Sequence, residues 1–135
     1  MEALPVGVVI LNRATYVVSV NEAFERLLGR SRREVGNQKL ETALPEVLIK
    51  EYQILERVAK IFSKEAGPDE FEAALSIDGQ DRVLRCLLRP GLTSDNPMRA
   101  MPTVVIVFHD VTKERQLQLQ VFQSEKMSSI GRIAG

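Results

Sequence analysis

The stretch Asn21-Glu-Ala-Phe-Glu-Arg-Leu-Leu-Gly-Arg-Ser-Arg-Arg-Glu-Val-Gly36 predicts two short helices in quick succession. Asn21 is a good N-cap, because its side-chain oxygen can accept a hydrogen bond from an unpaired backbone N–H of the first turn. The apolar residues that follow lie three and four positions apart and form one helical face: Ala23, Phe24, Leu27 and Leu28. Gly29 ends this helix in the left-handed conformation that glycine adopts without strain. Ser31 and Glu34 have the spacing of a capping box, which opens a second helix of about one turn.

Two β-branched runs precede this stretch, and a longer helical pattern follows it. Val6–Leu11 and Tyr16–Val20 are separated by four residues, which suits a hairpin connection. Pro45 is well placed as the first residue of a helix that continues to about Lys64. The apolar stripe of this expected helix consists of Leu48, Tyr52, Leu55, Ala59 and Phe62, widened by Ile54, Val58 and Ile61.

The next part of the chain returns to the period of two that is typical of strands. Apolar residues alternate through Phe71–Ile77, and Asp78-Gly79 is a strong signal for a two-residue hairpin turn. We expect Arg82–Arg89 as the returning strand, residues 90–102 as a loop and Thr103–Phe108 as the last strand. Five strands joined by hairpins and one helical excursion predict the α+β class, with a five-stranded antiparallel sheet and helices on one face.

A long exposed helix is expected from Thr112 onward. The chain contains neither Gly nor Pro between this residue and Gly131, and it is rich in Gln, Glu, Lys and Leu. The residues compatible with one apolar seam are Leu119, Phe122, Ile130 and Ile133. Leu117 and Val121 suggest a neighbouring seam. These seams predict a coiled coil, in which two copies of the chain pair as a homodimer.

Composition argues against several classes of function. The 18 basic and 18 acidic residues cancel, whereas a nucleic-acid-binding chain is expected to carry a clustered basic excess. No apolar run approaches the roughly 20 residues of a membrane span, so no membrane contact is expected in this chain. Cys86 is the only cysteine, which excludes an internal disulfide and favours a reducing, cytoplasmic compartment. A longer parent protein is free to carry a membrane anchor elsewhere.

No set of residues for catalysis or metal binding stands out. The chain has no Ser/His/Asp set, no phosphate-binding glycine loop and no metal-spaced cluster, so we do not expect it to be an enzyme by itself. His109 is the only histidine, ends a strand and is interpreted as structural. Cys86 shares a strand face with two leucines and is interpreted as a buried small hydrophobe. Three arginines recur near one side of the sheet and are interpreted as a solvated strand face, with an anion site as the alternative: Arg82, Arg85 and Arg89.

The order of the elements and the stretch 21–36 resemble the PAS family. That family shows Asn, Ala, two hydrophobic residues, Gly, a Ser or Thr, Glu, a hydrophobic residue and Gly at this spacing. Asp110-Val-Thr112 resembles the Asp-hydrophobic-Thr motif that ends PAS domains, in which the Asp and the Thr tie the last strand to the outgoing helix. The resemblance implies a PAS domain over residues 1–111 and a signalling linker helix over residues 112–135.

The end of the chain, Ser124–Gly135, is similar to the start of the dimerisation and phosphoacceptor helix of bacterial histidine kinases. This resemblance implies the cytoplasmic sensory domain of a two-component histidine kinase. Such a domain would relay a signal through Asp110 and Thr112 to a paired exit helix and so control autophosphorylation by downstream kinase domains of the same chain. The acceptor His and the ATP-binding domain are absent from this sequence. The alternative is a PAS dimerisation or ligand-binding module of another output class, such as a transcriptional activator or a cyclase.

The PAS resemblance also implies a small-molecule pocket between the sheet and the helices. The residues expected to line it come from the helical stripe and from one sheet face: Leu48, Tyr52, Leu55, Phe62, Leu84, Cys86, Ile106 and Phe108. No cofactor is recognised. The long helix lacks the His with which haem-binding relatives hold iron, and Cys86 lies far from the position of the reactive Cys in flavin-binding photoreceptors. The chemistry of any ligand stays open.

Overall fold

The computed structural model describes residues 6–92 and 101–121. The described elements run in the order β1 (Val6–Leu11), β2 (Val17–Val20), α1 (Glu22–Leu28), α2 (Arg32–Val35), α3 (Leu40–Ala43), α4 (Glu46–Lys50), α5 (Ile54–Phe62), β3 (Asp69–Ile77), β4 (Gln80–Leu92) and β5 (Pro102–Asp110). A further helix over residues 112–121 leaves the end of β5 and is termed the exit helix. No helix among the described residues is long and apolar enough to cross a membrane.

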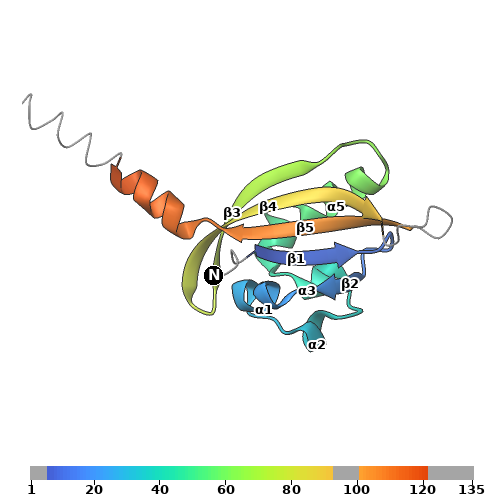
Figure 1. Cartoon of the computed structure of the whole chain (residues 1–135), viewed down its shortest axis with the longest axis horizontal. Helices are drawn as coiled ribbons and strands as arrows, with labels where there is room; N and C mark the ends of the chain where they lie inside the picture. The colour runs from blue at the N-terminus through green and yellow to red at the C-terminus, as the bar shows by residue number, and fades with distance from the viewer. Residues whose placement is uncertain (1–5, 93–100, 122–135) are drawn as a thin grey trace, which may run out of the picture.

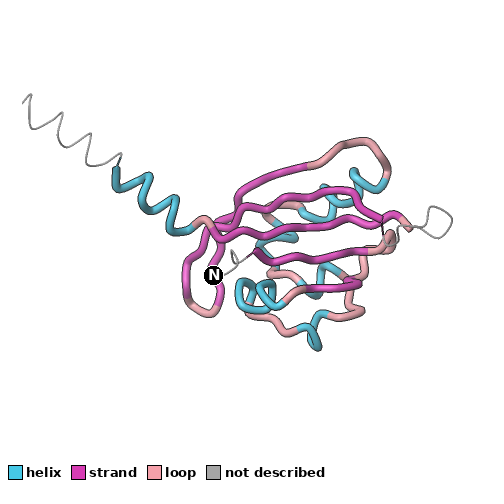
Figure 2. The backbone as a smooth tube through the Cα atoms, viewed as in Figure 1, coloured by secondary structure: helices cyan, strands magenta, loops and turns pink. Residues whose placement is uncertain are grey.

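The five strands form one antiparallel sheet in the order β2-β1-β5-β4-β3. Helices α1 to α5 lie on one face of this sheet, which is the far face in Figure 1. The last strand, β5, occupies the centre of the sheet between β1 and β4, so the two ends of the domain pair directly. The exit helix starts there and extends away from the sheet (Figure 2). This architecture confirms the predicted α+β class.

Asn21 joins α1 to β1 through three hydrogen bonds. Its Oδ1 accepts from the backbone N–H of Phe24 at 3.0 Å, as an N-cap does, and from that of Val8 at 2.9 Å. Its Nδ2 donates to the carbonyl of Val6 at 2.9 Å. The two elements can approach this closely because Gly7 has no side chain, and a Cβ there would lie 3.0 Å from the Cα of Phe24. The predicted cap therefore also fixes α1 against the sheet.

The β3–β4 hairpin turns at Asp78 and Gly79, as the sequence predicted. Their φ angles are 51° and 80°, the left-handed values that a type I′ turn requires at both central positions. The ladder begins with Ile77 opposite Gln80 and continues to Asp69 opposite Leu88. Both strands are longer than the alternation indicated, because backbone pairing continues through residues that are not alternately apolar.

The single helix expected over residues 45–64 is wrong, because the structure has two helices, α4 and α5, in its place. Gln53 interrupts the helical path with a left-handed φ of 53°. The preceding residue, Tyr52, uses its hydroxyl to accept a hydrogen bond from the backbone N–H of Ala74 at 3.0 Å. Its ring stacks on that of Phe71 with 5.6 Å between the centroids. These contacts with β3 accompany the break, and they depend on residues distant in sequence.

The break also changes which residues of α5 face the core. Ile54, Val58 and Ile61 are buried, whereas Leu55 and Phe62 of the expected stripe are only half-buried. The reason is that Gln53 separates the two helices, so the spacing of apolar residues counted along α4 does not continue into α5. Two smaller differences concern the preceding segment. The sequence did not predict α3, and Pro45 is the N-cap of α4 rather than its first residue.

Candidate functional site at the junction of the sheet and the exit helix

The exit helix begins where β5 stops pairing with β4. The last residue of β4 that this junction contacts is Val83. The backbone N–H of Val111 donates to the carbonyl of Val83 at 2.9 Å, which continues the ladder by one bond. The carbonyl of Val111 cannot complete the pair, because it accepts the first helical hydrogen bond, from Arg115 N–H at 2.9 Å. The hydroxyl of Thr112 accepts from Val83 N–H instead, at 2.9 Å. A side chain thus satisfies a part-buried donor that the end of the strand would leave unpaired.

Asp110 holds Thr112 in the position that this exchange requires. Its Oδ1 accepts from the backbone N–H of Thr112 at 2.9 Å and from the Thr112 hydroxyl at 2.5 Å. The carboxylate therefore caps the start of the helix and directs the hydroxyl lone pair toward β4. The sequence singled out both residues as the link between strand and helix, and the structure brings them together with Val83, which the sequence did not single out.

Arg115 attaches the exit helix to a second strand. Its Nε donates to Oε1 of Glu72 on β3 at 2.8 Å, and its second terminal nitrogen bonds the other carboxylate oxygen. Arg85 of β4 lies 3.5 Å from the same carboxylate and 3.4 Å from that of Glu70. The hydrogen bond from Arg115 lowers the pKa of Glu72 below its ordinary value of 4.5, and Glu72 in turn raises the pKa of Arg115. Sequence reasoning missed this pair, which is separated by 43 residues.

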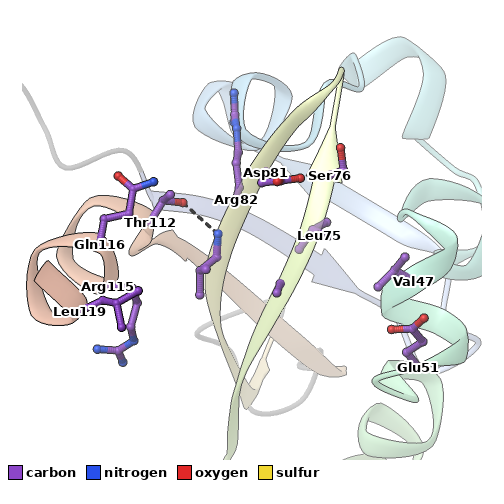
Figure 3. Close-up of a pocket in the computed structure, with 12 residues that line it drawn as sticks. Val47, Glu51, Leu75, Ser76, Asp81, Arg82, Thr112, Arg115, Gln116 and Leu119 are labelled. Atoms are coloured by element: carbon purple, nitrogen blue, oxygen red, sulfur yellow. Dashed lines mark hydrogen bonds between the residues drawn. The ribbon is translucent and has the colours of Figure 1, made fainter. Parts of the chain in front are cut away.

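A pocket of about 600 Å³ lies beside these attachments (Figure 3). The exit helix, the β3–β4 hairpin and α4 line it with Thr112, Arg115, Gln116, Leu119, Ala74, Leu75, Ser76, Asp81, Arg82, Val83, Val47 and Glu51. Figure 3 shows the residues of α4 and those of the exit helix on opposite sides of the hairpin. The lining is mixed, with aliphatic side chains and charges of both signs. Because Val83, Thr112 and Arg115 also make the two attachments, the pocket belongs to the same junction.

The residues expected to line a ligand pocket lie in the core between the sheet and the helices. Five of them are fully buried and contribute to one cluster: Leu48, Leu84, Cys86, Ile106 and Phe108. The other three are half-buried at its edge: Tyr52, Leu55 and Phe62. The structure therefore brings the set together, and its role in ligand binding stays a prediction. Burial raises the pKa of the Cys86 thiol to about 12, so this thiol stays protonated.

The remaining candidate residues separate onto the two sides of the sheet. His109 pairs with Val6 and with Arg85, on the face of the sheet away from the helices. Arg82 does not share that face with Arg85 and Arg89, which corrects the expectation of one arginine row. Its guanidinium donates to the carbonyls of Arg26 and Leu27 at 3.3 and 3.1 Å, where α1 ends. A cation at a helix C-terminus pairs with unsatisfied carbonyls, so its role here is structural.

The structure describes only part of the predicted helix seam. Leu119 lies in the exit helix and lines the junction pocket. Phe122 and Ile130 lie outside the described residues. Among the residues that the structure describes, no group of three or more His, Cys, Asp or Glu side chains could hold a metal ion.

The fold and this junction define a sensory-type α+β domain, and the comparisons name its family. The profile of the PAS family, described as the PAS fold, matches residues 1–111. The chain therefore belongs to the PAS family. The match ends between Asp110 and Thr112, within the motif that carries the strand-to-helix hydrogen bonds. A PAS domain by itself is a regulatory and not a catalytic module.

Solved structures with the same fold include PAS domains of signalling proteins. The PAS domain of BvgS from Bordetella pertussis is 12% identical, with a TM-score of 0.59, and 91% of this chain and 89% of that chain are covered. The PAS domain of the histidine kinase ThkA is 17% identical, with a TM-score of 0.58 and coverage of 78% and 98%. The LOV domain of a blue-light activated histidine kinase from Erythrobacter litoralis is 23% identical, with a TM-score of 0.56 and coverage of 82% and 99%. No curated protein matches the chain in sequence.

Proposed function

We propose that this chain is the sensory PAS domain of a histidine kinase, and that it relays its signal through the Asp110–Thr112 junction to a paired exit helix. The observation that carries the proposal is the hydrogen bond between Val83 N–H and the Thr112 hydroxyl, which Asp110 orients. Because this bond joins the sheet to the first residue of the exit helix, a shift of β4 or β5 changes the direction in which the helix leaves. Two arrangements of similar energy are enough for such a switch.

Two further observations support a kinase as the output. Histidine kinase PAS and LOV domains are among the proteins with this fold. The sequence Ser124–Gly135 is similar to the start of a kinase dimerisation helix and follows the domain in the order that such kinases use. The same fold also serves other outputs, as in an RNA-binding Light-Oxygen-Voltage receptor, so the kinase assignment needs its own test.

The proposal is tested by joining residues 1–135 to the dimerisation and ATP-binding domains of a histidine kinase. Autophosphorylation is measured for the unchanged domain, for Asp110→Ala and for Asp110→Asn. We expect Asp110→Ala to change the autophosphorylation rate while the far-ultraviolet circular dichroism of the isolated domain stays the same. Asp110→Asn is the matched control, because its remaining Oδ1 still accepts both bonds from Thr112. An unchanged rate in the Ala variant, in a fusion that is active, would rule out the relay.

Hydrogen exchange of the isolated chain gives an independent measurement of the same link. In the Ala variant, we expect faster exchange at the amides of the exit helix and at Val83, with unchanged protection in β1 and α1. Equal acceleration throughout the domain would mean that Asp110 supports the fold in general and does not specifically couple the sheet to the helix.

A further inference from the structure

Arg82 of β4 holds the C-terminal end of α1. Its guanidinium donates to the carbonyls of Arg26 and Leu27 at 3.3 and 3.1 Å, across 56 and 55 positions of the chain. The hairpin turn contacts the same end, because a Cβ on Gly29 would lie 2.8 Å from Oδ2 of Asp78. In Figure 3 the Arg82 side chain extends toward α1, which is pale blue in that view. The end of this helix is therefore attached to the β3–β4 hairpin.

The residue that follows Arg82 makes the bond to the exit helix. Thr112 accepts this bond from the backbone N–H of Val83 at 2.9 Å. The same N–H belongs to the peptide unit whose other end is the Cα of Arg82. A peptide unit is planar and nearly rigid, with about 3.8 Å between its two Cα atoms. The side chain that contacts α1 and the donor that binds the exit helix are therefore fixed to one rigid unit.

Small displacements of Arg82 reach the bond at Thr112 because this unit is short. A shift of about 1 Å at the Cα of Arg82 tilts a unit about 3.8 Å long by about 15°. Hydrogen bonds prefer N–H···O angles above about 150° and weaken as the angle falls. A tilt of this size therefore changes the strength of the bond without any rearrangement of the sheet.

The core determines where the C-terminal end of α1 lies. The start of the helix is fixed, since Asn21 binds β1 and a Cβ on Gly7 would lie 3.0 Å from the Cα of Phe24. The buried face of α1 packs on the sheet, where the ring centroids of Phe24 and Phe108 of β5 are 6.2 Å apart. A closely packed interior transmits strain, so a change of packing around Phe108 displaces α1 most at its far end. Arg82 holds this far end.

We infer that Arg82 is a positioning residue that couples the C-terminal end of α1 to the exit helix through the peptide unit it shares with Val83. The inference deepens the proposed function and rests on the relay through Asp110 and Thr112. It adds the route by which a change in the core reaches that relay. Arg82 acts through Val83, because it sets the orientation of the N–H that Thr112 accepts.

The inference is tested by hydrogen exchange of the chain of residues 1–135 carrying Arg82→Gln, measured amide by amide with NMR. The amide of Gly29, which bonds to the carbonyl of Glu25, reports on the end of α1. The amide of Arg115, in the first turn of the exit helix, reports on the coupling. We expect both amides to exchange faster, by about two- to tenfold at Arg115, as for substitutions that change the coupling between sites. A residue that only capped α1 would change Gly29 alone, and this result would overturn the inference.

Two further variants control for charge and for general loss of stability. Arg89→Gln removes the same charge from an exposed position near the other end of β4 and should leave both amides unchanged. Arg82→Lys keeps a cation beside the two carbonyls, although without the planar fork, and should recover part of the protection at Arg115. Rates at Arg115 are compared with those of the amides between β1 and β5. Equal acceleration at all of them would mean a general loss of stability and would also overturn the inference.

Combining Arg82→Gln with Asp110→Ala separates this inference from the proposed relay. If both residues act along one route, Asp110→Ala accelerates exchange at Arg115, and adding Arg82→Gln accelerates it no further while Gly29 still responds. Additive accelerations at Arg115 would place Arg82 on another route and contradict the inference.

The single variants distinguish the remaining cases. Acceleration at Arg115 by Asp110→Ala but not by Arg82→Gln would remove Arg82 from the mechanism and leave the relay intact. Acceleration by Arg82→Gln but not by Asp110→Ala would overturn both, because the exit helix would then respond without the Asp110–Thr112 junction.

Discussion

The Thr112 hydroxyl lies 2.9 Å from the backbone nitrogen of Val83 and accepts its hydrogen bond where β5 can no longer do so. The carbonyl that would complete this pair belongs to Val111, and it is already committed to the first turn of the exit helix. A strand and a helix are thus joined without an unpaired donor at the boundary. This exchange places the hydroxyl of one side chain at the boundary between the sheet and the exit helix.

Replacing Thr112 by Val should remove the hydroxyl while it keeps the shape of the side chain. We expect Thr112→Val to lower the free energy of unfolding by about 1–2 kcal/mol, because the part-buried N–H of Val83 loses its acceptor. Thr112→Ser keeps the hydroxyl and should lose less. Urea denaturation measures both changes, and a Val variant as stable as the Ser variant would show that water satisfies Val83.

Removing the Asn21 side chain should destabilise the whole domain. Asn21→Ala deletes one helix cap and two bonds to β1, and we expect a loss of about 2–3 kcal/mol in urea denaturation. Asn21→Asp retains the acceptor for Phe24 and Val8 but cannot donate to Val6. It should therefore lie between the wild type and the Ala variant. Equal stability of the Asp and Ala variants would contradict a major role for the acceptor bonds.

The attachment between Glu72 and Arg115 should depend on pH. The pKa of Glu72 is lowered in the folded chain by its hydrogen bond to Arg115. A lowered pKa means that the attachment is intact at neutral pH and is lost as the pH falls through the lowered value, below the ordinary 4.5. The carboxyl carbon shift of Glu72 in an NMR titration measures this directly. In Arg115→Gln, the midpoint should return toward the ordinary value, and no change in the midpoint would exclude the pair in solution.

The Cys86 thiol should be inert in the native protein. Full burial raises its pKa to about 12, so almost no thiolate exists at pH 8 and reagents cannot reach it. We expect alkylation to proceed only as fast as the domain opens, and urea should accelerate it by several orders of magnitude. Rapid alkylation without denaturant would instead point to a solvent path into the core.

Glycine at position 53 should stabilise the break between α4 and α5. Gln53 holds a left-handed φ of 53°, which costs a residue with a side chain about 1 kcal/mol and costs glycine little. Part of this gain is offset by the greater freedom of glycine in the unfolded chain, so we expect Gln53→Gly to add up to about 1 kcal/mol in urea denaturation. Gln53→Ala serves as the control and should change stability less. A destabilising Gly variant would mean that contacts of the Gln side chain outweigh the backbone conformation.

Much of the fold was predictable because its signals are local. The caps at Asn21 and Ser31, the left-handed Gly29 and the turn at Asp78-Gly79 each depend on hydrogen bonds or φ values within a few residues. The sequence therefore located these elements closely. The resemblance to the motif that ends PAS domains pointed to Asp110 and Thr112, and the structure joins these two residues by hydrogen bonds that span two positions.

Other features depend on which distant segments meet. The sequence by itself determined α1, α2 and the β3–β4 turn, because their caps and φ values depend on residues a few positions apart, and the strands were recognisable from the alternation of consecutive residues. Only the tertiary structure decided the break at Gln53, the placement of Arg82 at the end of α1 and the attachment of Arg115 to Glu72. Each of these needs a partner brought near by the sheet, 43 residues away in the last case. Periodicity along the exit helix carries no information about such a partner, because Glu72 reaches Arg115 only through the pairing of the strands.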